Sequence, residues 1–311
     1  MRAIVTGCAG FIGFHLTGRL LDEGVEVVGV DNVVSGQDRN VADLSARRGF
    51  TFLRQDVSAG LQIDGPVDAT YNLACPASPI DFDPKRLEIL AVCSRGVWNL
   101  LDLTREKNAT MLHTSTSEVY GDPLEHPQRE AYWGNVNPIG PRSCYDEGKR
   151  FAEALITAYR HQHGVRVRVA RIFNTYGPRM RTNDGRVLPN FISQALRGEP
   201  LTVYGDGKQT RSLCYIDDQV DGLIRLSRSD VDGPVNIGNP VELTMLELAQ
   251  EIIRLTGSKS RIRHVELPKD DPKVRRPDIT RAQTLLGWSP RVPREEGLKR
   301  TIEWFKTALN A

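Results

Sequence analysis

Apolar and polar residues follow two periodicities along the first half of the chain. Short apolar runs predict buried strands at 3–6, 25–30, 50–57, 67–73, 109–114 and 165–172. Apolar residues at helical spacing predict helices over 11–23, 84–107 and 143–163. Because strands that alternate with helices pair into parallel sheets with helices on both faces, we expect an α/β fold with a doubly wound parallel sheet.

The pattern changes after Asn174. Proline and glycine interrupt the chain repeatedly between 177 and 207, and the helices predicted beyond this point are shorter, at 188–197, 216–227 and 243–256. We therefore expect one domain over residues 1–175, to which 213–240 return. A smaller, mostly C-terminal α/β domain would be made of 176–212 and 241–311.

Composition narrows the class of protein without identifying it. The 41 Lys and Arg residues nearly balance the 39 Asp and Glu residues, which argues against binding to nucleic acid or to a membrane surface. No apolar run approaches the roughly 18 residues that span a bilayer, and we expect no signal peptide before the first strand. The five cysteines contain no CxxC pair, so we expect reduced thiols, a cytoplasmic protein and no metal site.

Three glycines, Gly7, Gly10 and Gly13, connect the first predicted strand to the first helix. Glycine is needed where the backbone turns tightly and approaches a pyrophosphate, and the helix N-terminus offers free N–H groups to the phosphates. Asp31 ends the second strand, where a carboxylate accepts hydrogen bonds from an adenosine ribose and repels a 2′-phosphate. The loop therefore predicts a Rossmann-type domain that binds NAD rather than NADP.

A tyrosine and a lysine, Tyr145 and Lys149, lie four residues apart and so share one face of the predicted helix. A free tyrosine, with a pKa of about 10, is a poor base at neutral pH. A cation held beside it stabilises the phenolate and lowers the pKa toward the working range. The pair therefore predicts a proton-transfer site next to the nucleotide.

The glycine loop, the Thr/Ser-rich segment 114–118 and the Tyr–Lys pair together resemble the extended short-chain dehydrogenase/reductases that act on nucleotide sugars. The resemblance runs nearly end to end. Within that family, the stretches 116–123, 137–150, 170–180 and 270–279 look closer still to the UDP-glucuronate decarboxylases. The resemblance implies NAD as the cofactor, UDP-glucuronate as the substrate, UDP-xylose as the product, and a C-terminal domain that holds the nucleotide sugar.

The implied reaction begins with oxidation at C4 of the sugar, after which the 4-keto intermediate loses its carboxyl group as CO₂. The hydride that NAD stored then returns to C4, so no net oxidation occurs. The middle motif favours this chemistry over two alternatives. The 4,6-dehydratases carry Asp-Glu where this chain has Ser117-Glu118, and the 4-epimerases usually lack the carboxylate.

The resemblance assigns a role to five catalytic residues. Tyr145 would remove the C4 hydroxyl proton, Lys149 would keep the phenol acidic, and Thr116 would hold the C4 oxygen. Glu118 would carry a proton or position water, and Arg275 would contact the substrate and assist protonation at C5.

The resemblance also implies which residues hold each ligand. For NAD they are Gly7, Gly10, Phe11, Ile12, Gly13, Asp31, Asn32, Ser35, Gly36, Asp56, Val57, Leu73, Ala74, Thr114, Tyr145, Lys149 and Thr175. For the nucleotide sugar they are Asn174, Arg186, Tyr204, Gln209, Arg211 and Arg275. Arg276 is the alternative to its neighbour Arg275 as the residue that contacts the substrate and assists protonation at C5. The planar guanidinium of Arg211 suits a diphosphate.

Three alternatives and two departures stay open. The chain could instead be a UDP-sugar 4-epimerase, a sugar 4,6-dehydratase, or a binding protein without catalysis. Cys75 and Cys93 stand where the family often has serine and asparagine, so a polar contact near the cofactor is missing.

The two long helices, 84–107 and 143–163, resemble the pair that joins two subunits in this family, and we expect a homodimer.

Overall fold

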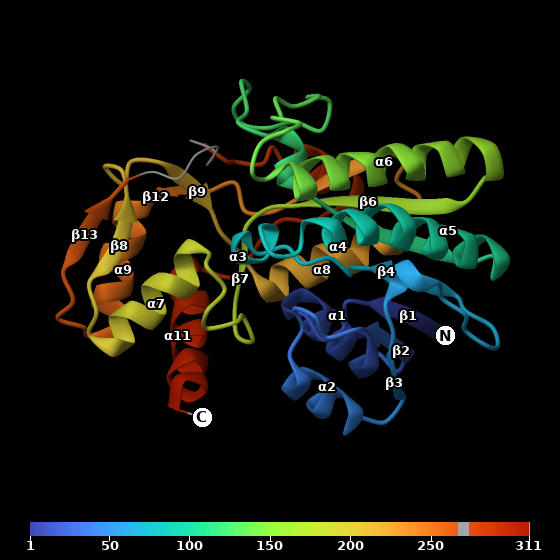
Figure 1. Ribbon diagram of the computed structural model, residues 1–311, viewed down its shortest axis with the longest axis horizontal. Coiled ribbons are helices and arrows are strands. Elements are labelled where there is room, and N and C mark those ends of the chain that lie inside the picture. Colours follow the sequence, from blue (N-terminus) through green and yellow to red (C-terminus); the bar gives the residue numbers. More distant parts are fainter. Residues whose placement is uncertain (267–273, 311) are drawn as a thin grey trace.

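A seven-stranded parallel sheet forms the centre of the computed structural model, which describes residues 1–266 and 274–310 (Figure 1). The strand order is β11-β6-β5-β4-β1-β2-β3, and every neighbouring pair is parallel. The strands are β1 (Arg2–Thr6), β2 (Glu26–Asp31), β3 (Phe50–Arg54), β4 (Ala69–Asn72), β5 (Thr110–Thr116), β6 (Arg166–Ile172) and β11 (Pro234–Ile237). This architecture confirms the α/β, Rossmann-type fold predicted from the sequence.

Helices cover both faces of the sheet, as Figure 1 shows. They are α1 (Phe11–Asp22), α2 (Asp38–Ser45), α5 (Val97–Glu106), α6 (Ser143–His163) and α8 (Ile216–Ser227). Successive residues of β1 point to opposite faces. Ala3 and Val5 pack in one apolar cluster with α1 and α8, whereas Ile4 packs in another with α5 and α6. Burial on both faces explains why the central strands are apolar almost throughout.

The helix predicted as one piece over 84–107 is interrupted. The structure has a short α3 (Pro79–Phe82), then α4 (Arg86–Ala91), a π-helical turn at Val92–Gly96 and finally α5. The π turn inserts one extra residue, which leaves apolar spacing on either side nearly unchanged and so is invisible to a periodicity argument. It rotates Cys93 into the interior, where it is 2% exposed.

A second lobe, on the left in Figure 1, contains three two-stranded sheets and several helices. Its strands are β7 (Thr175–Tyr176), β8 (Leu201–Tyr204), β9 (Thr210–Ser212), β10 (Cys214–Tyr215), β12 (Glu242–Thr244) and β13 (Ile262–Val265). Its helices are α7 (Val187–Arg197), α9 (Met245–Thr256) and α11 (Arg294–Asn310), whereas α10 (Thr280–Leu286) packs against α8 and β11 of the central sheet. These strands of two to four residues are too short to be predicted from apolar alternation in the sequence.

One apolar cluster joins the two lobes. Leu16 of α1 and Leu223 of α8 belong to the same buried cluster as Phe191 of α7 and Ile252 of α9. Across residues 1–266 and 274–310, none of the helices has the length and apolarity that a membrane crossing requires. The domain boundaries drawn from the sequence stay a prediction, although β11 does lie in the central sheet beside β6.

Candidate active site

The glycine loop between β1 and α1 has no room for side chains. Gly7 has φ +76°, and a Cβ atom there would lie 2.7 Å from the Leu73 carbonyl carbon. A Cβ at Gly13 would lie 2.0 Å from the Gly7 carbonyl oxygen. The backbone of the glycine loop therefore packs against the start of α1 with no side chain in between. A pyrophosphate can then approach the N–H groups of the helix N-terminus.

Asp31, at the end of β2, is predicted to bind the adenosine ribose, and it is hydrogen-bonded to the glycine loop. Its carboxylate accepts bonds from the backbone N–H groups of Ala9 at 2.9 Å and Val33 at 2.8 Å. Behind it, Asp56 accepts a bond from the Asn32 side chain at 3.3 Å. This acidic edge beside the glycines fits an adenosine ribose and disfavours a 2′-phosphate, so the residues present fit NAD.

Two adjoining hollows, here called the glycine-loop cavity, run along the carboxyl ends of the strands. Both are lined by Gly7, Gly10, Ser35, Leu73 and Cys75. Of the other predicted cofactor residues, those that line one of the hollows are Phe11, Ile12, Gly13, Asp31, Asn32, Gly36, Asp56, Val57, Ala74, Thr114, Tyr145 and Lys149. Thr175 is the exception, because it lines the neighbouring cavity instead.

Tyr145 is buried at the start of α6 and stacks on Phe82, with ring centroids 5.1 Å apart. Burial raises its pKa to about 12, even though Lys149 and a hydrogen bond with Thr116 both act to lower it. Lys149 lies 5.9 Å from the ring centroid and donates to the Thr114 carbonyl at 2.9 Å. Lys149 therefore acts on the phenol in the predicted direction, and its effect on the pKa is smaller than that of burial.

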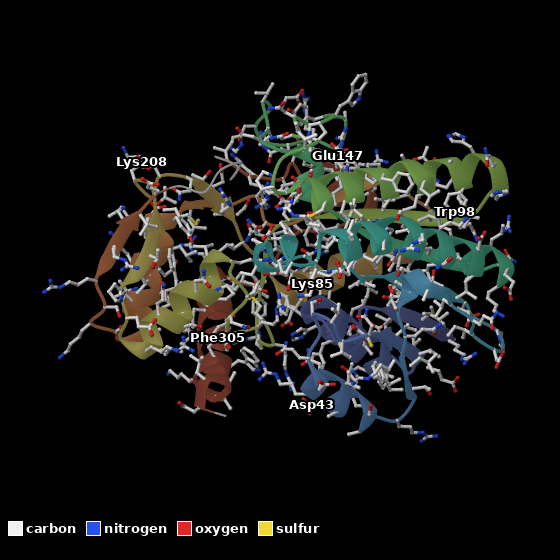
Figure 2. All side chains as sticks on the ribbon, in the orientation of Figure 1. Asp43, Lys85, Trp98, Glu147, Lys208 and Phe305 are labelled. Carbon is white, nitrogen blue, oxygen red and sulfur yellow. The ribbon has the colours of Figure 1, made fainter. Side chains whose placement is uncertain are left out.

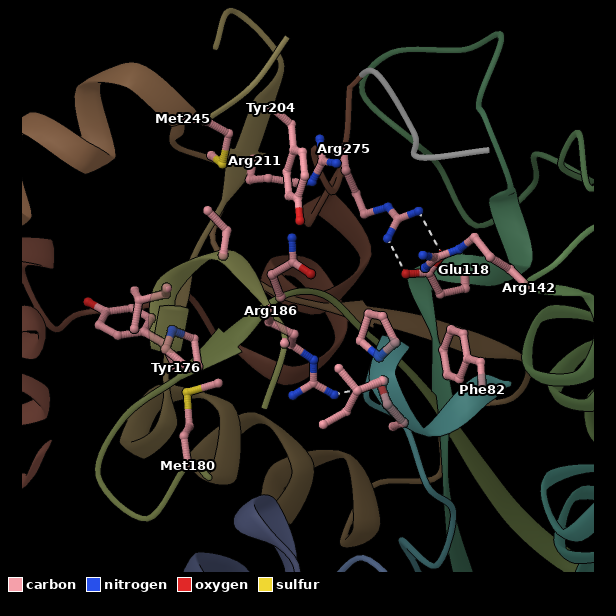
Figure 3. A pocket seen from close by; sticks show the side chains of 18 of the residues that line it. Phe82, Glu118, Arg142, Tyr176, Met180, Arg186, Tyr204, Arg211, Met245 and Arg275 are labelled. Carbon is pink, nitrogen blue, oxygen red and sulfur yellow. Dashed lines mark hydrogen bonds and ion pairs between the residues drawn. The ribbon is translucent and has the colours of Figure 1, made fainter. Parts of the chain in front are cut away.

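A larger cavity of about 580 Å³ opens between the two lobes (Figure 3). All six residues predicted to hold the nucleotide sugar line it: Asn174, Arg186, Tyr204, Gln209, Arg211 and Arg275. Among the described residues that line it, five are arginines, against two acids, Asp83 and Glu118. The volume suits one small ligand, and the excess of positive charge suits an anionic one.

Glu118 lies in this cavity between two arginines (Figure 3). Both guanidinium nitrogens of Arg275 donate to its carboxylate, one of them at 2.9 Å, and Arg142 donates at 2.9 Å from the other side. Burial would raise the pKa of Glu118, but the two arginines outweigh it and hold the pKa well below its usual range. Glu118 is therefore an anion at neutral pH and has no proton to donate in this state.

Hydrogen bonds from distant parts of the chain fix Arg275. Its carbonyl accepts from the Ser212 hydroxyl at 2.8 Å. The neighbouring Arg276 carbonyl accepts from the backbone N–H of Gln128 at 2.9 Å. Arg276 itself lies 3.8 Å from Glu242, away from Glu118, so Arg275 is the one that enters the cavity. Residues 270–273 of the predicted motif lie outside the described residues.

Two residues of this cluster were missed by the sequence analysis. Arg142 immediately precedes α6, and Asp146 lies one helical turn further along. Both side chains therefore lie on the side of α6 that faces Glu118. Asp146 is 7% exposed, and burial together with the negative charge of Glu118 raises its pKa to about 7. A signal for both was present in the sequence, because Arg142 and Asp146 are spaced i, i+4 on either side of Tyr145.

Family comparison agrees with this geometry. Residues 3–238 match the model of the NAD dependent epimerase/dehydratase family, and the chain belongs to that family. Within the family, the chain is 52% identical over 311 residues to UDP-glucuronic acid decarboxylase 3 of Arabidopsis thaliana, covering all of this chain and 90% of that protein. It is also 52% identical to UDP-glucuronic acid decarboxylase 1 of Danio rerio, over 99% of this chain and 73% of that protein. The predicted resemblance to the decarboxylases is confirmed.

Solved structures share the fold but differ in chemistry. UDP-glucuronic acid 4-epimerase from Bacillus cereus, in complex with UDP-glucuronic acid and NAD, matches with a TM-score of 0.87 and 28% identity over 99% of this chain and all of that chain. The dTDP-glucose 4,6-dehydratase DesIV from Streptomyces venezuelae, with NAD bound, matches with a TM-score of 0.90 and 27% identity over 100% of this chain and 98% of that chain. The fold therefore supports the NAD site and leaves the reaction to be decided by the large cavity and by the sequence.

Proposed function

We propose that this protein is an NAD-dependent decarboxylase that converts UDP-glucuronate to UDP-xylose and carbon dioxide. The observation that carries this proposal is the 52% identity to UDP-glucuronic acid decarboxylases over the whole chain. The solved epimerases and dehydratases reach only 26–28%. The arrangement of the site supports the same reading, because the proton-transfer pair lines the glycine-loop cavity and the charged cluster lines the large one.

Tyr145 and Thr116 would act at C4 of the sugar. Thr116 stands between the two cavities, since it is hydrogen-bonded to Tyr145 and accepts from the backbone N–H of Glu118 at 3.2 Å. A C4 hydroxyl placed there would lose its proton to Tyr145, and Lys149 would stabilise the phenolate that must form first. When bound, NAD supplies the hydride acceptor for this step and the hydride donor for the last one.

The cluster of Glu118, Arg142 and Arg275 would orient the carboxyl group that leaves. A ketone at C4 makes that group a β-keto acid, so CO₂ can depart with its electrons passing into an enolate. Two arginines around one carboxylate leave one net positive charge, which attracts the substrate carboxylate without surrounding it. Tighter binding would stabilise the ground state as much as the transition state and so would slow the step.

Glu118 would position groups rather than donate protons, because the two arginines keep it ionised. Arg186 and Arg211, which also line the cavity, would bind the diphosphate. Tyr204 and Gln209 line the wall beside them, and the Gln209 amide donates to the Tyr204 carbonyl at 2.9 Å.

The reaction is tested by incubating the purified protein with UDP-glucuronate and NAD⁺ in D₂O. We expect a UDP-pentose that carries one deuterium at C5, and NAD⁺ that is not consumed. A six-carbon epimer would identify an epimerase instead. An unchanged substrate that still binds would identify a binding protein, and either result would refute the proposal.

We also propose a cytoplasmic homodimer. Exposed apolar side chains cluster on the layer of α4, α5 and α6: Leu87, Leu90, Trp98 and Phe151. Figure 2 shows Trp98 and Glu147 on this layer. Leu87→Asp is expected to shift the sedimentation mass from about twice to about once the 34.7 kDa of the chain. Leu285→Asp, on the remote helix α10, is the control and should leave the dimer intact.

A further inference from the structure

Two thiols meet beside the glycine-loop cavity. The Sγ atoms of Cys75 and Cys93 lie 3.6 Å apart. Cys75 follows the end of β4, whereas Cys93 comes from the π turn, which is the local feature that turns it inward. On its other side, a Cβ at Gly148 would lie 3.1 Å from the Cys93 Cβ, so the missing side chain of Gly148 makes room for Cys93 against α6.

The pair is placed where it can affect the cofactor. Cys75 is partly exposed and lines both hollows of the glycine-loop cavity, and Cys93 is buried directly behind it. Leu73 and Ala74, which lead into Cys75, touch the glycine loop so closely that a Cβ at Gly7 would lie 2.8 Å from the Ala74 nitrogen. Movement of Cys75 is therefore transmitted to the backbone that would surround the dinucleotide.

We propose that Cys75 and Cys93 form a reversible disulfide that weakens NAD binding, so that the protein carries a redox-sensitive modification site in its cofactor pocket. This inference concerns the NAD site and does not depend on which reaction the large cavity performs. Thiols of cytoplasmic proteins are normally reduced, so a bond of this kind would be transient and regulatory.

The chemistry needs a peroxide as oxidant. Hydrogen peroxide, small enough to enter the cavity, would oxidise Cys75 to the sulfenic acid and release one water. The Cys93 sulfur would then attack the Cys75 sulfur, and hydroxide would leave and take up the remaining proton as a second water. In total, two thiols and one peroxide become one disulfide and two waters. In the reduced pair the hydrogen bond from Cys75, followed by the nearby Lys149 ammonium, lowers the pKa of Cys93, whereas the same hydrogen bond and burial raise the pKa of Cys75, so the oxidation of Cys75 is expected to be the slow step.

Closing the bond demands movement. A disulfide is about 2.05 Å long, so the two sulfurs must approach by about 1.5 Å. Cys93 is held in the helical π turn, whereas Cys75 lies in the loop after β4, so most of the displacement falls on Cys75 and on the Leu73–Ala74 backbone. We therefore expect the oxidised protein to bind NAD at least about tenfold more weakly.

The modification is tested on the intact chain. Thiols are counted in denaturant before and after peroxide treatment, and the count should fall from five to three. Trypsin separates the two cysteines into peptides 55–85 and 87–95, so their covalent linkage is read directly by mass spectrometry. Five remaining thiols, or linkage of either cysteine to Cys144, would overturn the proposal.

The coupling to NAD has its own readout. The NAD dissociation constant is measured by calorimetry for the reduced, the oxidised and the re-reduced protein. By reciprocity, a tenfold weakening means that saturating NAD raises the reduction potential of the disulfide by about 30 mV. Equal NAD affinity in the oxidised and reduced forms would refute the coupling.

Three serine variants serve as controls. Cys75→Ser should keep its four thiols after peroxide treatment, and peroxide should not change its NAD affinity. Cys93→Ser should lose one thiol, because the sulfenic acid of Cys75 has no second thiol to attack it, and it should show no peptide linkage. Cys144 belongs to the same apolar cluster as Cys93 but not to the proposed disulfide. The Cys144→Ser variant keeps both cysteines of the pair, so it should still lose two thiols. A loss of two thiols in Cys75→Ser would contradict the assignment, and the linkage found in the unmodified chain decides the matter if a variant fails to fold.

Discussion

The two ends of the active site are built in opposite ways. The glycine-loop cavity is formed largely by residues that follow successive strands of one sheet, and its key contacts are backbone to backbone. The large cavity takes its charged side chains from widely separated places in the chain, among them Glu118, Arg142, Arg186, Arg211 and Arg275. The first is set by steric limits on the main chain, and the second by charge balance among side chains.

This difference explains what each end can tolerate. One added carbon displaces a backbone cradle, yet this fold binds NAD in a solved epimerase and in a solved dehydratase. A cluster of charged side chains keeps its shape when one member changes, but its net charge changes at once. Cofactor binding is therefore expected to be shared across the family, and the reaction to be decided where the side chains converge.

Tyr145 lies where the two ends meet, so Tyr145→Phe should have the largest effect. The ring would still stack on Phe82, but no group would remain to take the C4 proton. We expect the turnover rate to fall about a thousandfold, with NAD and UDP-glucuronate binding little changed. Steady-state kinetics and calorimetry measure the two quantities. Tyr159→Phe, in the same helix but hydrogen-bonded to Asp102, is the control and should retain activity.

Glu118→Gln tests the charge balance of the large cavity. The substitution leaves Arg142 and Arg275 without their counter-charge, so we expect the unfolding free energy to fall by about 3 kcal/mol. Turnover should fall about a hundredfold because the arginines would then hold the substrate carboxylate too tightly. NAD affinity should not change. Urea unfolding, kinetics and calorimetry separate these outcomes.

The control for that experiment is Glu153→Gln. Glu153 also pairs with a partly buried arginine, Arg171, at 2.7 Å, but it lines neither cavity. It should lose a comparable amount of stability and keep its turnover rate. If both variants lost activity to the same degree, the effect of Glu118 would be structural and the charge argument would fail.

Gly13→Ala tests the backbone end. The new Cβ would lie 2.0 Å from the Gly7 carbonyl, so the loop must move away from the helix N-terminus. We expect NAD to bind about tenfold more weakly, while UDP-glucuronate binding changes little. Gly18→Ala lies in the same helix, where the nearest atom is the flexible end of Arg47 at 3.2 Å. This control should bind NAD normally and be more stable by up to about 1 kcal/mol.

The contrast between a site built from backbone and a site built from distant side chains also determines which residues can be predicted from the sequence. Gly7, Gly10, Gly13 and Asp31 form a local motif whose geometry follows from strand and helix ends, and all four line the glycine-loop cavity. Arg275 was found through a family motif, since no periodicity links it to Glu118, 157 residues away. Strands of four residues such as β8 are too short to alternate visibly.

Two misses have a physical cause. The π turn changes one residue in a helix of otherwise regular spacing, and the contact between Cys75 and Cys93 depends on it. The role of Asp146 depends on burial beside Glu118, which is a tertiary property. Neither spacing nor composition carries that information.

Asp146→Asn should give the smallest effect and the sharpest distinction between the two ends. In the folded protein the pKa of Asp146 is raised to about 7, above its unfolded value, because burial and Glu118 disfavour the charged form. Its contribution to stability is therefore complete at low pH and is lost as the pH rises through 7. The pKa of about 7 already includes the effect of the nearby arginines, so we expect the stability advantage of the variant to grow by about 2 kcal/mol between about pH 5.5 and pH 8.

The same titration should reach the large cavity and not the glycine-loop cavity. Ionised Asp146 cancels the remaining positive charge of Glu118, Arg142 and Arg275, so the KM for UDP-glucuronate should rise above pH 7 in the unmodified protein and stay flatter in Asp146→Asn. NAD affinity should have the same pH profile in the unmodified protein and in Asp146→Asn. Glu147→Gln, the partly exposed neighbour, should behave like the unmodified protein. A change in the pH profile of NAD binding would show that the two ends share one electrostatic environment, and the contrast between them would not hold.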